Sequence, residues 1–235
     1  MNADARRREY LKALGVDCYR PRGAVAPTSA SASQAESAVI EPAPPAAQPP
    51  PADWESLRAR VNACRACTLG STRTNAVFGV GNPAADLLIV GEAPGAEEDR
   101  RGEPFVGRAG QLLDEMLRAI EFTRDDVFIV NMLKCRPPNN RDPLADELAA
   151  CRGYLEQQIA HVAPRLLLAV GRIAAQALLD VNEPLGRLRG RTHHHDAWAA
   201  PVIVTYHPAY LLRTPAQKAR SWQDLKQVRR ILRES

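Results

Sequence analysis

Four short apolar segments, separated by longer segments of helical character, restrict the fold of this chain more than any other feature. They are residues 87–90, 127–130, 166–170 and 202–205. Uninterrupted apolar strands of this length are typical of parallel sheets, because both faces of such a sheet are buried. Parallel strands also need long crossover connections, which are usually helices. The sequence therefore predicts an α/β protein, a three-layer α/β/α sandwich around a central, mainly parallel four-stranded sheet.

The helices of this sandwich are predicted from apolar residues at helical spacing. Asp53 is predicted to cap a helix whose apolar side includes Leu57 and Val61. Further helices are expected at residues 112–120, at residues 144–162, after Gly171 and at the basic C-terminus.

The first 52 residues differ in composition from the rest of the chain. Residues 1–22 are basic, whereas residues 23–52 consist mostly of Ala, Ser and Pro and contain no aromatic residue. Such a composition cannot bury enough apolar surface to offset the entropy of ordering. We therefore expect a basic N-terminal segment at 1–22, a disordered linker at 23–52 and one globular domain at 53–235. The tail is a candidate for recruiting an unidentified protein partner.

The whole chain has 31 Lys and Arg against 27 Asp and Glu, a net charge of +4. No segment has the pattern of a signal peptide or the length of a membrane span. We therefore expect a cytoplasmic protein with no membrane partner. In a reducing compartment, its five cysteines favour metal ligation or simple burial over disulfide bonds.

Four of these cysteines form a candidate metal site. Cys64 and Cys67 form a Cys-x-x-Cys at the end of the first predicted helix, and Cys135 and Cys151 flank a proline-containing loop. Cys64 or Cys151 taken singly fits a buried core position. Cys-x-x-Cys with two further cysteines favours a metal site instead. Both zinc and an iron–sulfur cluster accept four thiolates, and the spacing does not choose between them.

Residues suited to ligand recognition follow three of the predicted strands. In open α/β sheets, ligands bind beyond the carboxyl ends of the strands. A ring, an amide and an imidazole at one sheet edge suit a planar polar ligand such as a base, although each alone also fits a structural role. The candidates are Gly91, Glu92, Glu98, Phe105, Asn131 and His207.

Basic residues are predicted to face a polyanion near this edge. Arg187, Arg189 and Arg191 occur at a period of two, so an extended backbone would present them on one face. The segment from Tyr210 onward is also basic and includes Arg213. A solvated helix face is the alternative interpretation of the C-terminal charges.

From about Cys64 to the C-terminus, the chain resembles the family 4 uracil-DNA glycosylases, the iron–sulfur type. The matching motifs are Cys64-x-x-Cys67, GEAPG followed by GEPFVGRAGQLLD, VNMLKCRPPNNRDP, Cys151 and HPAYLLR. The resemblance implies a base excision repair enzyme that flips uracil out of DNA and hydrolyses its N-glycosidic bond. We also expect a monomer that associates with the nucleoid when it is bound to DNA. The resemblance also implies a 4Fe-4S cluster held by Cys64, Cys67, Cys135 and Cys151.

The resemblance further implies residue roles in the pocket. Phe105 is expected to stack on uracil, Asn131 to recognise its edge and His207 to stabilise the departing base. Separately from the resemblance, the basic pattern described above leads us to expect DNA contacts from Arg187, Arg189, Arg191 and Arg213.

One difference from better-known uracil glycosylases concerns the water-activating group. Those enzymes carry an aspartate where this chain has Ala93, so Glu92, or else Glu98, is expected to orient water. The same motif ends in Gly95 instead of a bulky ring. Glu98 is therefore also the candidate for excluding the methyl group of thymine.

Two other classes of protein fit part of this pattern. One is a noncatalytic or covalent uracil-binding relative, and the other is a zinc-stabilised DNA-binding module. The covalent relatives carry a basic, histidine-containing loop after the second strand, whereas residues 134–141 contain no histidine. This difference favours the hydrolytic enzyme.

Overall fold

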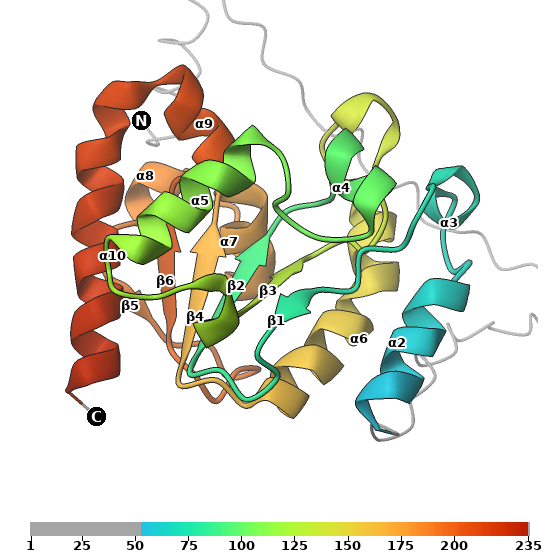
Figure 1. Cartoon of the computed structure of the whole chain (residues 1–235), viewed down its shortest axis with the longest axis horizontal. Coiled ribbons are helices and arrows are strands. Elements are labelled where there is room, and N and C mark those ends of the chain that lie inside the picture. Colours follow the sequence, from blue (N-terminus) through green and yellow to red (C-terminus); the bar gives the residue numbers. More distant parts are fainter. Residues whose placement is uncertain (1–52, 235) are drawn as a thin grey trace, which may run out of the picture. The chain divides into compact units, whose positions relative to one another are not determined.

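The computed structural model of the protein describes residues 53–234, in which a sheet lies between helices (Figure 1). The basic segment predicted for residues 1–22 and the linker predicted for 23–52 lie outside the described residues.

The sheet has six strands in the order β1-β3-β2-β4-β6-β5. Its four central strands are parallel and match the predicted segments: β2 (Leu87–Gly91), β3 (Val127–Asn131), β4 (Leu166–Val170) and β6 (Val202–Thr205). All residues of these strands are buried, which explains their uninterrupted apolar character. The predicted α/β class and mainly parallel sheet are confirmed.

Two short antiparallel strands extend the sheet at its edges and were not predicted. β1 (Val80–Gly81) pairs with β3, and β5 (Thr192–His193) pairs with β6. The prediction of a four-stranded sheet missed them because two residues are too few to give a hydrophobic period.

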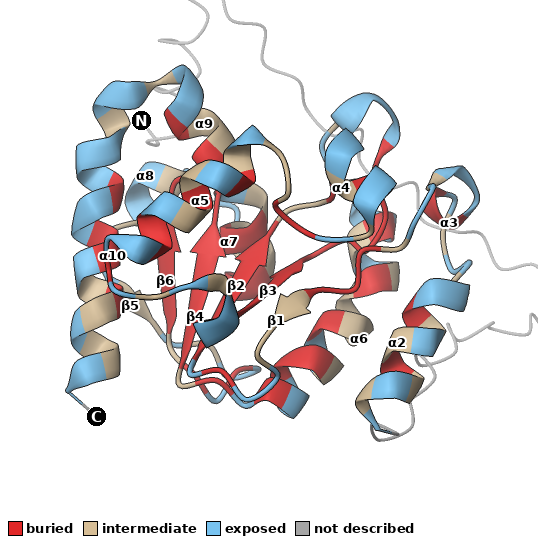
Figure 2. Ribbon diagram, in the orientation of Figure 1, coloured by how far each residue is buried: buried red, intermediate tan, exposed pale blue. Residues whose placement is uncertain are grey.

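The two faces of the sheet are covered by different helices, as the three-layer prediction requires. The face bearing Leu88 and Val90 packs against α2 (Trp54–Ala63), α6 (Ala145–Val162), α7 (Arg172–Leu179) and α8 (Leu185–Leu188). The face bearing Leu87 and Ile89 packs against α5 (Arg108–Arg118), α9 (Pro208–Arg213) and α10 (Lys218–Arg233). Figure 2 shows the buried strands between these helices.

Short elements occupy the connections and bring the site residues together. They are α3 (Leu69–Thr72), α4 (Ala96–Arg101), η1 (Arg124–Asp126), η2 (Pro138–Asn140) and η3 (Pro215–Gln217). The predicted cap of α2 is confirmed, since Asp53 Oδ1 accepts a hydrogen bond from Ser56 N at 2.8 Å. Within residues 53–234, every helix is too short or too polar to cross a membrane.

The arginines of residues 186–191 do not share one extended backbone, because Arg187 lies in a helix whereas Arg189 has extended φ and ψ angles of −77° and 161°. Helix α8 occupies the first part of this segment, and its last residue, Leu188, is only 1% exposed. The apolar pair Leu185 and Leu188, three residues apart, packs inward and determines the local structure. The period of two among the arginines therefore does not place their side chains on one face.

Candidate active site

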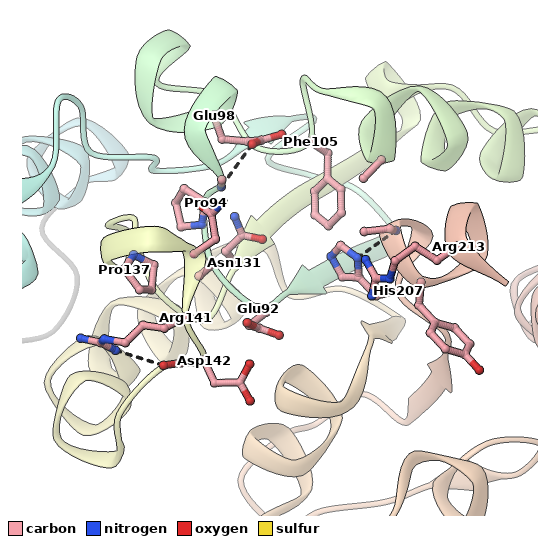
Figure 3. Close-up of a pocket in the computed structure, with 16 residues that line it drawn as sticks. Glu92, Pro94, Glu98, Phe105, Asn131, Pro137, Arg141, Asp142, His207 and Arg213 are labelled. Atoms are coloured by element: carbon pink, nitrogen blue, oxygen red, sulfur yellow. Dashed lines mark hydrogen bonds between the residues drawn. The ribbon is translucent and has the colours of Figure 1, made fainter.

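A cavity of about 460 Å³ lies at the carboxyl ends of β2, β3 and β6. Figure 3 shows the side chains that line it, which come from several separate loops. Five of the six residues predicted from the strand ends line this cavity: Glu92, Glu98, Phe105, Asn131 and His207. The sixth, Gly91, ends β2 directly beside two of them.

Gly91 allows Asn131 and Phe105 to approach each other closely. It pairs with Asn131 in the parallel register of β2 and β3. A Cβ atom at Gly91 would lie 2.3 Å from Asn131 Oδ1 and 2.7 Å from Phe105 Cζ. Asn131 is 2% exposed, and its carboxamide makes no hydrogen bond with any group of residues 53–234. Its donors and acceptor are therefore left for a ligand.

The Phe105 ring forms an apolar wall of the cavity. It lies 5.5 Å from the His207 ring, centroid to centroid, with 27° between the planes. Its backbone φ is +54°, a left-handed conformation that is costly for a bulky residue. The rest of the fold must hold this conformation in place.

His207 follows β6 and caps helix α9. Its Nδ1 accepts a hydrogen bond from Ala209 N at 3.1 Å, so the proton of the neutral ring resides on Nε2. Burial, with a smaller contribution from the Arg213 guanidinium, lowers the pKa of His207 to about 4, and Glu98 opposes this shift. Near neutral pH the ring is therefore an uncharged N–H donor at the cavity.

Glu92 is the first charged residue after β2 and is partly buried in the same cavity. Burial raises the pKa of its carboxyl, the nearby Asp142 raises it further, and Arg172 opposes both effects. Asp142 is held by Arg172, with 2.7 Å between Oδ2 and Nη2. Asp142 was not predicted as a site residue, because nothing in its local sequence indicates that its loop folds back toward Glu92.

The carboxylate of Glu98 lines the cavity but is already engaged by backbone N–H groups. Its Oε2 accepts from Gly95 N at 3.1 Å, and its Oε1 accepts from Val106 N and Gly107 N at 3.0 and 3.1 Å. These bonds tie the GEAPG loop to the segment that carries Phe105. The geometry favours a positioning role for Glu98 over the orientation of water.

The four predicted cysteine ligands line a second, small cavity between α2, α3, α6 and the loop after β3. Three of their sulfurs accept N–H hydrogen bonds: Cys64 from Ala66 N at 3.5 Å, Cys135 from Arg73 Nη1 at 3.0 Å and Cys151 from Lys134 N at 3.3 Å. Burial is the main reason why the pKa of the Cys135 thiol is raised. Burial is also the main reason why the pKa of Cys151 is raised to about 11. The structure thus brings all four cysteines together.

Lys134 connects this cysteine site to the first cavity. Its side chain is only 1% exposed, and its Nζ donates to the backbone oxygen of Asn131 at 2.7 Å. Burial lowers the pKa of Lys134 to about 8, although the sulfurs of Cys151 and Cys135 act in the opposite direction. Within residues 53–234, no three His, Cys, Asp or Glu side chains converge as ligands of a single metal ion.

The four arginines predicted to contact DNA differ in their surroundings. Arg213, Arg187 and Arg191 are all exposed, and Arg213 also lines the first cavity. The Arg189 side chain is 10% exposed, pairs with Asp224 at 2.6 Å and lies 4.2 Å above the Tyr206 ring. Its position therefore does not support the predicted contact between Arg189 and DNA.

Comparison with known proteins identifies relatives of this chain. Residues 78–226 match the family model of the uracil DNA glycosylase superfamily. The chain is 45% identical to a type-4 uracil-DNA glycosylase of Pyrobaculum aerophilum, over 74% of this chain and 91% of the relative. It is 43% identical to the type-4 enzyme of Archaeoglobus fulgidus, over 72% of this chain and 87% of the relative. It is 40% identical to the type-4 enzyme of Thermotoga maritima, over 77% and 95%.

The family match spans all six strands of the sheet, helix α9 and the first half of α10, and it includes every residue that lines the first cavity. The chain therefore belongs to the uracil DNA glycosylase superfamily and, within it, to the type-4 uracil-DNA glycosylases.

Proposed function

We propose that this protein excises uracil from DNA by hydrolysing the N-glycosidic bond, which leaves an abasic site for base excision repair. The observation that carries this proposal is the meeting of Phe105, Asn131 and His207 at one cavity. Relatives named as uracil-DNA glycosylases, at 40–45% identity, support the same reaction.

Recognition of an extruded uracil rests on Phe105 and Asn131. Flipping a base out of the duplex costs a few kcal/mol, which the pocket must offset through stacking and hydrogen bonds. The Phe105 ring offers a stacking face. The free carboxamide of Asn131 can donate to uracil O4 and accept from N3–H, whereas cytosine presents the opposite order of donor and acceptor. A fixed Asn131 therefore disfavours cytosine.

Departure of the base rests on His207. As the bond between N1 and C1′ breaks, its electron pair leaves with uracil and an oxocarbenium-like charge develops on the sugar. The uncharged Nε2–H of His207 can donate a hydrogen bond to the uracil anion. Because the ring is neutral, it stabilises this anion without giving up its own proton. Pre-aligned donors of this kind stabilise transition states strongly because they need no reorganisation.

Glu92 is our candidate for the group that orients the attacking water. Both oxygens of Glu98 are occupied by backbone N–H groups, whereas Glu92 lines the cavity with a raised pKa. Water adds to C1′ and transfers a proton to the Glu92 carboxylate, which a raised pKa favours. Uracil then takes a proton from solvent.

The cysteine site fits an iron–sulfur cluster. Four sulfurs line one cavity, yet no three of the described ligand side chains converge on one ion. In a 4Fe-4S cluster each thiolate binds a different iron, so the sulfurs need not converge. Cys64, Cys67, Cys135 and Cys151 would hold the cluster, and N–H···S bonds from Arg73 and Lys134 favour thiolates there. Its contribution would be structural, joining α2, α6 and the loop after β3.

DNA contact is assigned to Arg213 at the mouth of the cavity and to the exposed Arg187 and Arg191. Phosphate contacts from such side chains make binding dependent on salt.

A cleavage assay tests the proposed function. The full chain, incubated with an end-labelled oligonucleotide that contains one uracil, should give an alkali-labile abasic site at that position. The same oligonucleotide with thymine or cytosine serves as the control. An adduct that survives denaturation would indicate the covalent relative, and intact DNA after binding would indicate a noncatalytic one. Either result would refute hydrolysis.

A further inference from the structure

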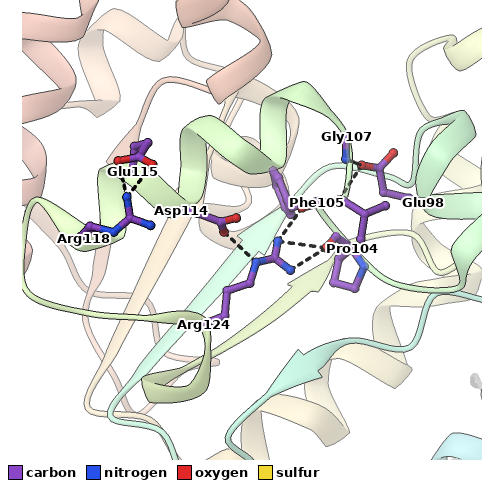
Figure 4. A network of polar contacts seen from close by, with 9 residues as sticks. Glu98, Pro104, Phe105, Gly107, Asp114, Glu115, Arg118 and Arg124 are labelled. Carbon is purple, nitrogen blue, oxygen red and sulfur yellow. Dashed lines mark hydrogen bonds and ion pairs between the residues drawn. The ribbon is translucent and has the colours of Figure 1, made fainter.

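Phe105 has a left-handed backbone conformation, and polar side chains contact residues 104–107 from two sides (Figure 4). Left-handed backbone is unfavourable for a residue with a large side chain, so the conformation persists only where neighbouring contacts enforce it. The contacts at this segment therefore determine where the Phe105 ring lies.

On one side, the guanidinium of Arg124 holds two successive carbonyl groups. Its Nη2 donates to the Phe105 oxygen at 2.5 Å, and both terminal nitrogens lie 3.3–3.4 Å from the Pro104 oxygen. Its Nε donates to Asp114 Oδ1 at 2.7 Å, which fixes the orientation of the planar fork. Arg124 belongs to η1 and Asp114 to α5, so the segment is tied to two separate elements.

On the other side, Glu98 holds the two N–H groups that follow. Its Oε1 accepts from Val106 and Gly107. Gly110 allows this packing, because a Cβ atom there would lie 1.7 Å from the Phe105 oxygen. A cation thus holds the carbonyls before the turn and an anion holds the N–H groups after it.

We propose that Arg124, oriented by Asp114, is a positioning residue that sets the stacking ring of Phe105 in the base pocket. The proposal rests on the proposed function, because it assigns Arg124 a role only through the ring that stacks on uracil. Arg124 does not line the cavity, so its effect on uracil must pass through residues 104 and 105. Only a forked donor can bind Asp114 and two carbonyls together.

The test compares Arg124→Gln with a matched control, Arg118→Gln. Arg118 is an exposed arginine close by, which pairs with Glu115 on the same helix and touches neither carbonyl (Figure 4). Arg124→Gln should lower the single-turnover rate of uracil cleavage by about 10- to 100-fold, as expected for misplacement of a contact by about 1 Å. The affinity of Arg124→Gln for the same duplex without uracil should stay within about twofold. The reason is that Phe105 acts on the extruded base, whereas contacts with the DNA backbone involve other residues. Arg118→Gln should behave like the wild type.

A double-mutant cycle separates positioning from general destabilisation. In a Phe105→Ala background, Arg124→Gln should change the rate by less than about twofold, because the ring it positions is gone. An equal loss with and without Phe105 would overturn the proposal. If Arg124→Gln does not fold, Asp114→Asn should give the same non-additivity with Phe105→Ala, and wild-type rates for Asp114→Asn would also overturn it. If the wild-type protein does not cleave uracil-containing DNA at all, the proposed function fails instead.

Discussion

Replacing Gly91 by alanine should disable the base pocket while leaving the fold intact. The added Cβ would lie 2.3 Å from Asn131 Oδ1 and 2.7 Å from Phe105 Cζ. Ordinary contacts of this kind begin near 3.4 Å, so the Asn131 amide must move by about 1 Å. The backbone of Gly91 lies in strand β2 and has no positive φ, so alanine itself causes no backbone strain there.

The size of the effect follows from that displacement. A shift of about 1 Å in a positioned group costs about 10²-fold in rate, equal to about 2.7 kcal/mol of barrier. Gly91→Ala should therefore lower single-turnover cleavage of a uracil oligonucleotide by about 10²-fold. Its thermal unfolding midpoint should stay close to that of the wild type. Gly186→Ala is the matched control, because a Cβ there meets nothing within 4 Å.

Two results would refute this reasoning. If Gly91→Ala cleaves within about twofold of the wild type, then Asn131 and Phe105 do not bind uracil in the positions described. If Gly186→Ala loses as much activity as Gly91→Ala, the loss does not arise from the space beside Asn131.

Four further predictions concern individual groups of the site. His207→Ala should lower single-turnover cleavage by about 10²- to 10³-fold, as for loss of an oxyanion donor, with a much smaller loss in binding of uracil-containing DNA; equal losses in both would contradict a role in departure of the base. Asn131→Asp, which offers only acceptors, should lower uracil excision and permit some cytosine excision, measured on matched oligonucleotides; unchanged selectivity would refute edge recognition. Because burial raises the pKa of Glu92 above 4.5, the rate of uracil cleavage should be constant at higher pH and fall as the pH drops through that raised value. The Glu92→Gln variant should cleave slowly and lack this decrease at low pH. If the variant still shows the decrease, another group causes it. Purified protein should be brown with four iron atoms per chain, and removal of the iron should lower its stability; colourless protein with stoichiometric zinc would contradict the cluster.

The sequence allowed the central sheet and much of the site to be predicted, because buried parallel strands give uninterrupted apolar runs. Those runs also locate Asn131, which follows the apolar residues 127–130 and ends β3, and His207, which comes two residues after β6. The four cysteines were predictable as a set because metal sites use recognisable spacings, and the structure brings them to one cavity.

Contacts that depend on tertiary structure could not be predicted from local pattern. Arg189 resembles a surface cation in sequence, yet it pairs with the buried Asp224, 35 residues away. Arg124 likewise gives no local signal, because its partners Pro104 and Phe105 lie about 20 residues earlier. The role of Glu98 depends on backbone N–H groups that become available only when the loop folds.

The hydrogen bond from Ala209 N to His207 Nδ1 has an evolutionary consequence. One imidazole begins helix α9 through Nδ1 and presents Nε2 to the cavity, so selection for a folded chain and selection for repair act on the same side chain. Loss of a helix cap costs about 1 kcal/mol, enough to reduce the amount of a marginally stable protein in a cell. Asparagine, a good cap, would preserve the helix but would have no group at the position of Nε2. A lineage that abandoned uracil excision would therefore be expected to retain histidine or a short capping residue at position 207, whereas Asn131 would be free to drift.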